Sequence, residues 1–382
     1  MRILADENIP LLDEFFAGEG EITRLPGRAI DAAAMANADA LLLRSVTRVS
    51  ADMLRDSPVR FVGTCTIGTD HLDLPGLAAA GVQVASAPGC NARGVVEYVL
   101  SVLLTLSERS GLDWRQRTVG IIGVGEVGSR LAETLRQLGV SVLCCDPPRA
   151  EQGAAGMLSL DEVLAAADVI SCHVPLTRQG PHATGHLFNQ ARLHALRPGT
   201  WLINSSRGPV IDNTALQRLL TERNDLQVAL DVWEHEPTLE PALVARCALA
   251  TPHIAGYSLD GKLRGTEMIY QAWCAFKGQP VQRALADFAP AAGCNTLQLD
   301  SDAPGDWQLS RALRWVYDVR DDDARLRAML AQFTDQTTIR AGFDLLRKHY
   351  PLRRETPCVR IAGAGLDSTR LLQAAGFKVA GN

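Results

Sequence analysis

Three short polar segments in the second half of the chain carry side chains that together could oxidise an alcohol. The segments read SSRG (residues 205–208), DVWEHEP (231–237) and TPHIAG (251–256); the first two follow or end a short apolar run, and the third comes after them in the chain. We predict that these runs are β-strands of one parallel sheet. Because ligands bind beyond the carboxyl ends of the strands in such a sheet, we expect the three segments to form one site.

Arg207, Glu236 and His253 are the residues suited to this chemistry. A histidine can take the hydroxyl proton, and a carboxylate bonded to its other ring nitrogen orients the ring and stabilises the imidazolium ion. An arginine offers a forked, permanent charge to a carboxylate and to an oxygen that becomes a carbonyl. Singly, each residue also fits a turn, a solvated loop or a structural histidine, so the prediction rests on their combination.

A glycine-rich turn earlier in the chain predicts a bound dinucleotide. Gly123, Gly125 and Gly128 form the pattern GxGxxG between a predicted strand and a predicted helix. The first glycine permits a tight turn, the second lets backbone amides approach a pyrophosphate, and the third lets helix and strand pack closely. We expect Glu126 and Val127 in the same turn to contact the cofactor as well. The acidic side chain at position 126 fits a phosphate site if it points outward.

Asp146 favours NAD over NADP as that dinucleotide. It ends the next predicted strand, where a carboxylate can accept hydrogen bonds from the ribose hydroxyls and would repel a 2′-phosphate. The alternative is that Asp146, followed by two prolines, only forms the turn that stops the strand. The nearby Arg149, in contrast, is a cation that could bind the 2′-phosphate of NADP.

These residues need a scaffold of alternating strands and helices. Strands are predicted at residues 3–5, 40–43, 61–63 and 82–85 in a first series and at residues 118–122, 141–145, 168–173, 200–204 and 227–231 in a second. Helical segments separate the strands, which is typical of doubly wound parallel sheets. The most apolar stretch, residues 95–106, is interrupted by Glu97 and is too short to cross a bilayer. We interpret it as a buried helix.

The chain changes character after Val281. Residues 289–293 contain proline and glycine, and residues 307–333 are predicted to form an amphipathic helical segment rich in Asp and Arg. We place a third, smaller domain in this part of the chain.

Composition and charge exclude several classes of partner. The 382 residues are 47% hydrophobic and 21% charged, with a net charge of −5 and no stripe of Lys or Arg, so no nucleic acid partner is expected. The nine cysteines lack the spacing of zinc ligands, and no metal site is expected. The N-terminus carries acidic residues where an export signal would be apolar, so we expect a cytoplasmic location and no membrane partner.

The segments SSRGPVID, ALDVWEHEP and TPHIAG resemble the signature segments of the D-isomer-specific 2-hydroxyacid dehydrogenases, over roughly residues 40 to 285. The resemblance implies that Arg207 binds the substrate, that Glu236 is the partner of the histidine and that His253 is the acid/base. Glu236 is preferred over the nearby Glu234 and His235 because the family's carboxylate stands directly before a proline. His173 fits a family segment beside the cofactor and stays outside the catalytic set. The resemblance also places Ser206, Arg207, Asp231 and Gly256 at the cofactor.

The same resemblance implies the fold and the domain division. We expect an α/β fold in which a Rossmann-like NAD-binding domain (residues 94–256) is joined to a flavodoxin-like α/β substrate domain, or lid (1–93 and 257–285). A small C-terminal α+β domain (286–382) would form a homodimer.

Further segments narrow the resemblance to one branch of the family, whose members oxidise a phosphorylated small 2-hydroxy acid. These segments are RSVT (residues 44–47), GTCTIGTDH (63–71), PHIAGYSLDGK (252–262) and FDLLRKHY (343–350). Ser45, Thr66 and Tyr257 are the predicted substrate contacts, although Ser45 and Thr66 also fit ordinary turn chemistry. The alternatives are a dehydrogenase of 3-phosphoglycerate, glyoxylate or hydroxypyruvate, and a corepressor or scaffold that senses NAD without turnover.

Overall fold

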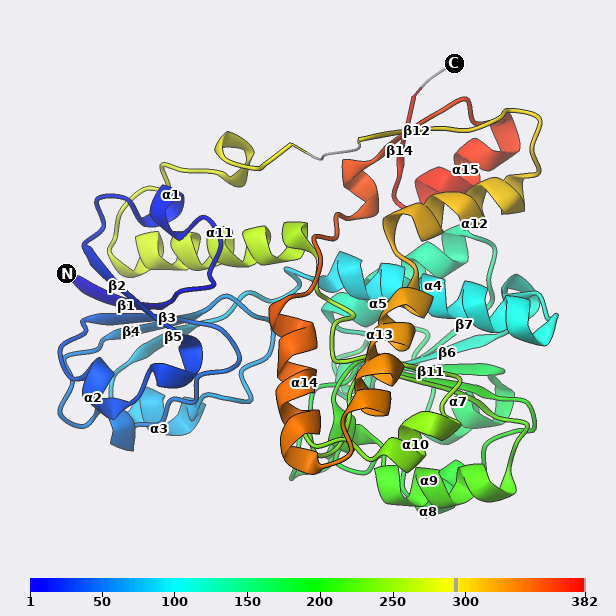
Figure 1. Cartoon of the computed structure of the whole chain (residues 1–382), viewed down its shortest axis with the longest axis horizontal. Helices are drawn as coiled ribbons and strands as arrows, with labels where there is room; N and C mark the ends of the chain where they lie inside the picture. Colours follow the sequence, from blue (N-terminus) through cyan, green and yellow to red (C-terminus); the bar gives the residue numbers. More distant parts are fainter. Residues whose placement is uncertain (292–294, 381–382) are drawn as a thin grey trace. The chain divides into compact units, whose positions relative to one another are not determined.

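The computed structural model describes residues 1–291 and 295–380, which divide into two compact units. The first unit contains residues 1–91 and 258–291, and the second contains residues 92–257 together with the described residues from 295 on. Each unit has an α/β core, as Figure 1 shows. Two residues of the predicted proline- and glycine-containing stretch, 292 and 293, lie outside the described residues.

The first unit is built on a five-stranded parallel sheet in the order β2-β1-β3-β4-β5, the flavodoxin-like order. Its strands are β1 (Arg2–Asp6), β2 (Glu21–Leu25), β3 (Ala40–Leu43), β4 (Phe61–Thr64) and β5 (Gln83–Ala85). One face packs on the helices α1 (Leu12–Phe16) and α11 (Leu259–Phe276), and the other packs near α2 (Ala32–Met35) and α3 (Leu74–Ala79). The four predicted strands are confirmed, and the edge strand β2 was not predicted.

The second unit is built on a six-stranded parallel sheet in the order β11-β10-β9-β8-β6-β7. Its strands are β6 (Val119–Ile122), β7 (Val142–Cys145), β8 (Val169–Cys172), β9 (Trp201–Asn204), β10 (Gln227–Leu230) and β11 (Leu249–Ala250). The five predicted strands are confirmed, and the two-residue strand β11 is the additional one. This strand matters because the segment that contains His253 follows it.

Helices cover both faces of this sheet, as expected for a doubly wound fold (Figure 1). One face packs on α4 (Ala92–Ser110) and α5 (Glu126–Gln137). The other face packs on α7 (Leu160–Ala166), α8 (Gln190–His194), α9 (Asn213–Glu222) and α10 (Pro241–Arg246). The predicted buried helix is confirmed as α4, and Glu97 within it is only 2% exposed.

The C-terminal part of the chain packs in the same compact unit and adds a small parallel sheet, β12 (Thr296–Gln298), β13 (Arg360–Ala362) and β14 (Lys378–Val379). Its helices are α12 (Gly305–Val316), α13 (Val319–Gln332), α14 (Gln336–Lys348) and α15 (Leu366–Ala374). The helical segment predicted over residues 307–333 is helical but divided into α12 and α13, because the chain is extended at Tyr317 and Asp318. The Asp318 side chain then accepts a hydrogen bond from the Arg320 amide and caps the second helix.

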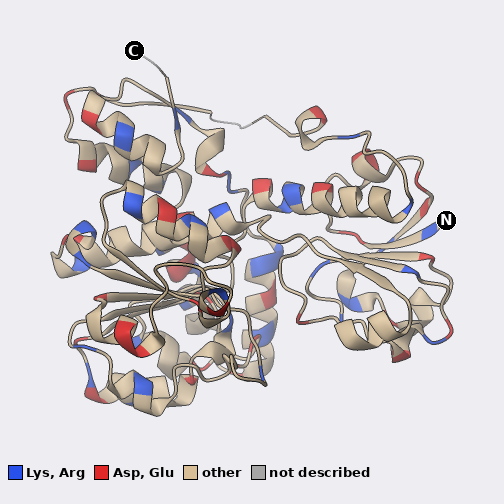
Figure 2. Ribbon diagram, turned by 180° about the vertical axis from the view of Figure 1, so that it is seen from behind, with Lys and Arg blue, Asp and Glu red and all other residues tan. Residues whose placement is uncertain are grey.

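Charged residues of both signs are interspersed along the elements of each unit (Figure 2). Within the described parts of the chain, no helix combines the length and the apolar character that crossing a bilayer requires.

Candidate active site

Glu236 and His253 form a hydrogen-bonded pair at the carboxyl-end edge of the large sheet. Glu236 lies on the loop after β10, and His253 lies on the loop after β11. The Nδ1 atom of His253 is 2.6 Å from Oε2 of Glu236, and Oε1 accepts a hydrogen bond of 2.7 Å from the Trp233 amide. Because the glutamate holds Nδ1, the other ring nitrogen, Nε2, is left to exchange a proton with a ligand.

The backbone of His253 has an unusual conformation. Its φ of 56° lies in the left-handed region that favours glycine. Strained residues of this kind persist where the surrounding structure fixes them, and they concentrate at functional sites.

Asp231 provides that fixation for the His253 loop, which we define as residues 251–257. Its buried carboxylate accepts hydrogen bonds from the Thr251 hydroxyl at 2.6 Å and from the Ile254 and Ala255 amides at 2.9 Å each. In addition, the His253 amide donates to the Asp231 carbonyl at 2.7 Å. Burial raises the pKa of Asp231, against the effect of these hydrogen bonds and of the His253 charge. The sequence pattern associated Asp231 with the cofactor and gave no sign of this role in the loop.

Opposing effects act on the Glu236 carboxyl. Burial raises its pKa, but the charge and hydrogen bond of His253, the Trp233 amide and the charge of Arg347 outweigh burial. The pKa therefore lies below its ordinary value, and Glu236 is an anion at neutral pH. A fixed anion at Nδ1 stabilises the imidazolium ion that forms when Nε2 takes a proton.

Arg207 lies on the loop after β9, which is shaped by the buried side chain of Asn204. The amide oxygen of Asn204 accepts hydrogen bonds from the Ser206 amide and hydroxyl at 3.1 and 2.8 Å, and its amide nitrogen donates to the Arg207 carbonyl at 3.0 Å. The next residue, Gly208, has no room for a side chain, because a Cβ there would lie 1.9 Å from the Trp233 carbonyl oxygen. The Arg207 loop therefore packs directly against the loop that carries Glu236.

The glycine-rich turn after β6 has the geometry that a pyrophosphate requires. Gly123 has a φ of 90°, and a Cβ on Gly128 would lie 2.0 Å from the Gly123 carbonyl oxygen. A Cβ on Gly125 would have no neighbour within 4 Å, and no side chain caps the α5 N-terminus at this residue. The helix therefore presents its first amides to open space, where an anion can accept them.

Glu126 does not conflict with an anion in this turn. Its carboxylate pairs with Arg130 one helical turn further along α5, and both side chains are about half exposed. Its negative charge is thus balanced by a neighbour on the same helix. Val127, the next residue, packs against the core beneath the helix.

Asp146 directly follows β7 and faces the same turn. Its carboxylate accepts hydrogen bonds from the Val124 amide at 2.8 Å and from the Arg149 amide at 3.1 Å, where it caps α6 (Pro147–Glu151). Because a carboxylate offers about four acceptor positions, capacity for ribose hydroxyls remains. The Arg149 guanidinium bonds to the Val124 carbonyl across the turn. The turn-forming role of Asp146 is thus confirmed, and its cofactor role stays a prediction.

The predicted substrate residues lie in different units. Ser45 follows β3 and Thr66 follows β4, so both lie at the carboxyl ends of adjacent strands in the first unit. The Thr66 hydroxyl lies 2.8 Å from that of Thr64. Tyr257 belongs to the second unit, where it follows Gly256 at the end of the His253 loop.

The alternative residues Glu234 and His235 do not take part in the pair with His253 in the described structure. Glu234 bonds to His186 and accepts the Asn213 amide at 3.0 Å. His173 bonds to the Ser171 hydroxyl at 2.8 Å, and burial lowers its pKa to about 3, so its ring is neutral at pH 7.

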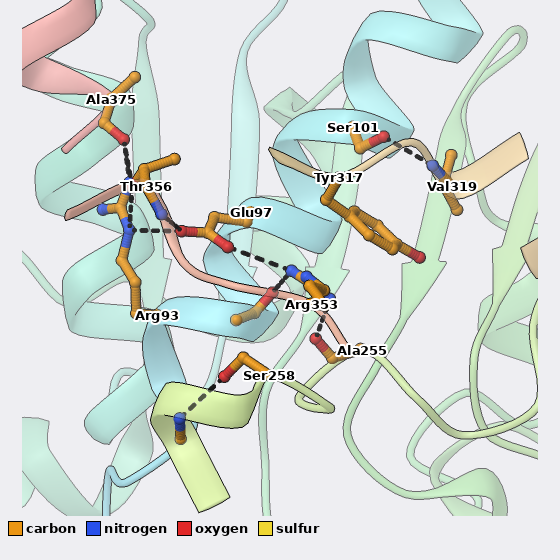
Figure 3. A network of polar contacts seen from close by, with 12 residues as sticks. Arg93, Glu97, Ser101, Ala255, Ser258, Tyr317, Val319, Arg353, Thr356 and Ala375 are labelled. Carbon is orange, nitrogen blue, oxygen red and sulfur yellow. Dashed lines mark hydrogen bonds and ion pairs between the residues drawn. The ribbon is translucent and has the colours of Figure 1, made fainter. Parts of the chain in front are cut away.

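Three C-terminal residues adjoin the His253 loop: Arg347 and Tyr350 belong to the segment FDLLRKHY, and Arg353 was missed in the sequence. The Arg347 guanidinium lies 5.5 Å from the centre of the Tyr257 ring, and Tyr350 packs edge-on against the same ring at 5.7 Å. Arg353 donates a hydrogen bond of 3.1 Å to the Ala255 carbonyl and pairs with the buried Glu97, as Figure 3 shows. The only sign of Arg353 in the sequence is the isolated charge of Glu97 within an apolar helix, because a buried carboxylate requires a cation as partner.

Known proteins match the chain over almost its whole length. It is 58% identical to the erythronate-4-phosphate dehydrogenase of Pseudomonas paraeruginosa and 57% identical to that of Pseudomonas aeruginosa, over 99% of this chain and 100% of each relative. Residues 103–255 match the family described as D-isomer specific 2-hydroxyacid dehydrogenase, NAD binding domain. Residues 288–376 match a domain of unknown function (DUF3410).

Solved structures share the fold. The D-lactate dehydrogenase of Aquifex aeolicus, in complex with NAD and lactic acid, has a TM-score of 0.60 at 24% identity, over 74% of this chain and 100% of that one. The 3-phosphoglycerate dehydrogenase of Entamoeba histolytica, bound to NAD, has a TM-score of 0.62 at 22% identity, over 74% and 97%. The relatives of high identity and the matched family domain establish that the chain belongs to the D-isomer specific 2-hydroxyacid dehydrogenases and is an NAD-dependent oxidoreductase.

Proposed function

We propose that the chain oxidises 4-phospho-D-erythronate with NAD to 2-oxo-3-hydroxy-4-phosphobutanoate, an early step towards pyridoxal 5′-phosphate. The observation that carries the proposal is the 58% identity to an erythronate-4-phosphate dehydrogenase, which extends over the C-terminal part of the chain as well as the α/β units. The hydrogen bond between Glu236 and His253 supports the chemistry.

In the proposed mechanism, the Nε2 atom of His253 takes the proton of the C2 hydroxyl while the C2 hydrogen leaves as hydride. Glu236 keeps the ring oriented and balances the charge that it gains. Arg207 binds the substrate carboxylate and polarises the C2 oxygen as it becomes a carbonyl. NAD, when bound, supplies the nicotinamide ring that accepts the hydride.

The proposed cofactor contacts combine the glycine turn with the strand ends. Backbone amides of the turn would hold the pyrophosphate, and Asp146 would accept the ribose hydroxyls. The full proposed set is Gly123, Gly125, Glu126, Val127, Gly128, Asp146, Ser206, Arg207, Asp231 and Gly256. Ser45, Thr66 and Tyr257 are the proposed substrate contacts.

The domain limits, assembly and location predicted from the sequence stay part of this proposal. They are a lid of residues 1–93 and 257–285, an NAD-binding domain of residues 94–256, and a C-terminal domain of residues 286–382 that forms a homodimer. The cytoplasm is the predicted location.

The first experiment measures NADH formation by the purified protein with 4-phospho-D-erythronate, 3-phosphoglycerate and D-glycerate, with a 2-oxo acid acceptor added in case the cofactor stays bound. We expect selective turnover of 4-phospho-D-erythronate, which Arg207→Ala and His253→Ala abolish. If 3-phosphoglycerate or D-glycerate reacts faster, the named substrate is wrong although the family holds. Bound NAD without any turnover would favour the alternative of an NAD sensor.

A further inference from the structure

We infer that Arg353, in the C-terminal part of the chain, is a positioning residue for the His253 loop, an inference that rests on the proposed function. Arg353 is only 6% exposed and donates to two backbone carbonyls of the NAD-binding part. One guanidinium nitrogen bonds to the Ala255 carbonyl at 3.1 Å, as Figure 3 shows. Another bonds to the Gly94 carbonyl at 2.6 Å. Ala255 is two residues after His253, so this contact acts close to the proposed acid/base.

The buried position of the Arg353 cation is stabilised from two sides. Its guanidinium lies 3.8 Å from the centre of the Tyr317 ring and 3.3 Å from Oε2 of Glu97. Glu97 also accepts hydrogen bonds from the Thr356 amide at 2.7 Å and from Arg93 at 3.2 Å. A buried cation needs such pairing, and an arginine fork that is held in this way has one fixed direction.

The two carbonyls lie next to the points where the chain passes between the compact units, after Asn91 and after Tyr257. Gly94 lies in the first turn of α4, shortly after the first of these points, and Ala255 lies in the His253 loop, shortly before the second. Arg353 therefore ties both segments to one another and to the C-terminal domain. Tyr350 and Arg347 extend the contact, because both pack on Tyr257 at the end of the same loop.

Two sets of hydrogen bonds thus hold the His253 loop. Asp231 accepts hydrogen bonds from the Ile254 and Ala255 amides, and Arg353 donates a hydrogen bond to the Ala255 carbonyl. Because His253 has a left-handed backbone, its ring direction depends on how firmly the flanking peptides are held. We assign this positioning role to the C-terminal domain, in addition to its proposed role in dimer formation.

The test uses Arg353→Lys and Arg353→Met in the full-length protein, with Arg117→Met as the matched control. Arg117 also donates to two backbone carbonyls, of Asp168 and Gly199, and lies 4.5 Å from the centre of the Trp201 ring. It does so at the amino ends of the strands, the sheet edge opposite to the proposed site. Lysine keeps a cation beside Glu97 but lacks the planar fork that serves two carbonyls, so Arg353→Lys should fold even if Arg353→Met does not.

The first readout is the separation of kcat from the KM for NAD. We expect kcat for 4-phospho-D-erythronate to fall roughly 10-fold in Arg353→Lys and roughly 100-fold in Arg353→Met, with the KM for NAD within about 2-fold of wild type, because small displacements of an acid/base are costly to rate. Arg117→Met should lose thermal stability and keep kcat. The inference is overturned if Arg353→Lys keeps the wild-type kcat, or if Arg117→Met loses kcat to the same extent.

The second readout, amide hydrogen exchange in peptides that cover residues 251–257, needs no substrate. Exchange should be at least about 10-fold faster in Arg353→Lys and unchanged in Arg117→Met, because exchange reports local opening of the loop. This result would support the inference even if the wild-type protein did not oxidise 4-phospho-D-erythronate. A lack of turnover would refute only the proposed function. Wild-type exchange in the Arg353 variants would overturn the inference.

Discussion

The carboxylate of Glu236 lies 2.6 Å from Nδ1 of His253, although the two residues come from loops after different strands. The geometry predicts that the loss of the Glu236 charge changes chemistry far more than binding. We expect Glu236→Gln to lower kcat about 100- to 10,000-fold, the range of general acid–base catalysis, as measured by NADH formation. The control is Glu234→Gln, two residues away, which pairs with His186. Equal kcat values in the two variants would contradict the proposed roles.

Asp146 predicts the selectivity between NAD and NADP. Asp146→Asn keeps an N-cap side chain for α6 and removes the charge that would repel a 2′-phosphate. We expect the Kd for NAD, measured by calorimetry, to rise about 10- to 100-fold as charge-assisted hydrogen bonds are lost, while NADP binding improves. Asp168→Asn is the control, because Asp168 accepts the Thr118 amide at the amino ends of the strands. Unchanged discrimination between the cofactors would exclude the assigned role.

The burial of His173 should make the stability of the protein depend on pH. Burial lowers its pKa to about 3 in the folded chain, whereas an unfolded histidine has a pKa of about 6.5. Between these values the unfolded chain binds the additional proton, so the free energy of unfolding falls with decreasing pH by up to about 1.4 kcal/mol per pH unit.

The measurement for His173 is urea unfolding of the wild type and of His173→Asn at pH 7 and pH 5. We expect the acid-induced loss of stability to be about 2 kcal/mol smaller in the variant. An Asn substitution of the exposed His194, at the end of α8, should leave the loss as in the wild type. The same loss in all three proteins would show that His173 does not carry the effect.

The loops that carry Arg207 and Glu236 pack so closely at Gly208 that no side chain fits between them. A Cβ at this position would lie 1.9 Å from the Trp233 carbonyl oxygen. Because the oxygen is a backbone atom and the Cβ is bonded to the backbone, no side-chain rotation can relieve this clash. Gly208→Ala should therefore lower the free energy of unfolding by about 1–3 kcal/mol and reduce kcat. Gly185→Ala, where a Cβ would have no neighbour within 4 Å, is the control in the same unfolding and activity assays. Wild-type stability of Gly208→Ala would show that the loops can separate.

The sequence predicted the elements whose side chains are buried on both faces. Val119–Ile122 is entirely buried and appears in the sequence as a continuous apolar run, as expected for a central parallel strand. The edge strand Glu21–Leu25 was missed because its residues are exposed or half-buried and therefore polar in part. Leu249–Ala250 was missed because two residues produce no pattern.

The proposed site could be predicted only as far as local motifs extend. Arg207, Glu236 and His253 stand in short segments that follow strands, and the structure brings Glu236 and His253 into contact. Arg353 stands in no motif, and its partners Gly94 and Ala255 are distant in the sequence. Such contacts are set by the tertiary packing of the C-terminal domain and leave only indirect signs, such as Glu97 within an apolar helix.

Arg207, Glu236 and His253 all lie within one compact unit, on the loops that follow β9, β10 and β11. The distances among them are therefore set when that unit folds, before a substrate is present. A preorganised site of this kind spares the protein the reorganisation of dipoles and charges that would otherwise accompany every turnover. By the same reasoning, mutations that shift these three loops relative to one another should slow the chemical step even where they touch no ligand.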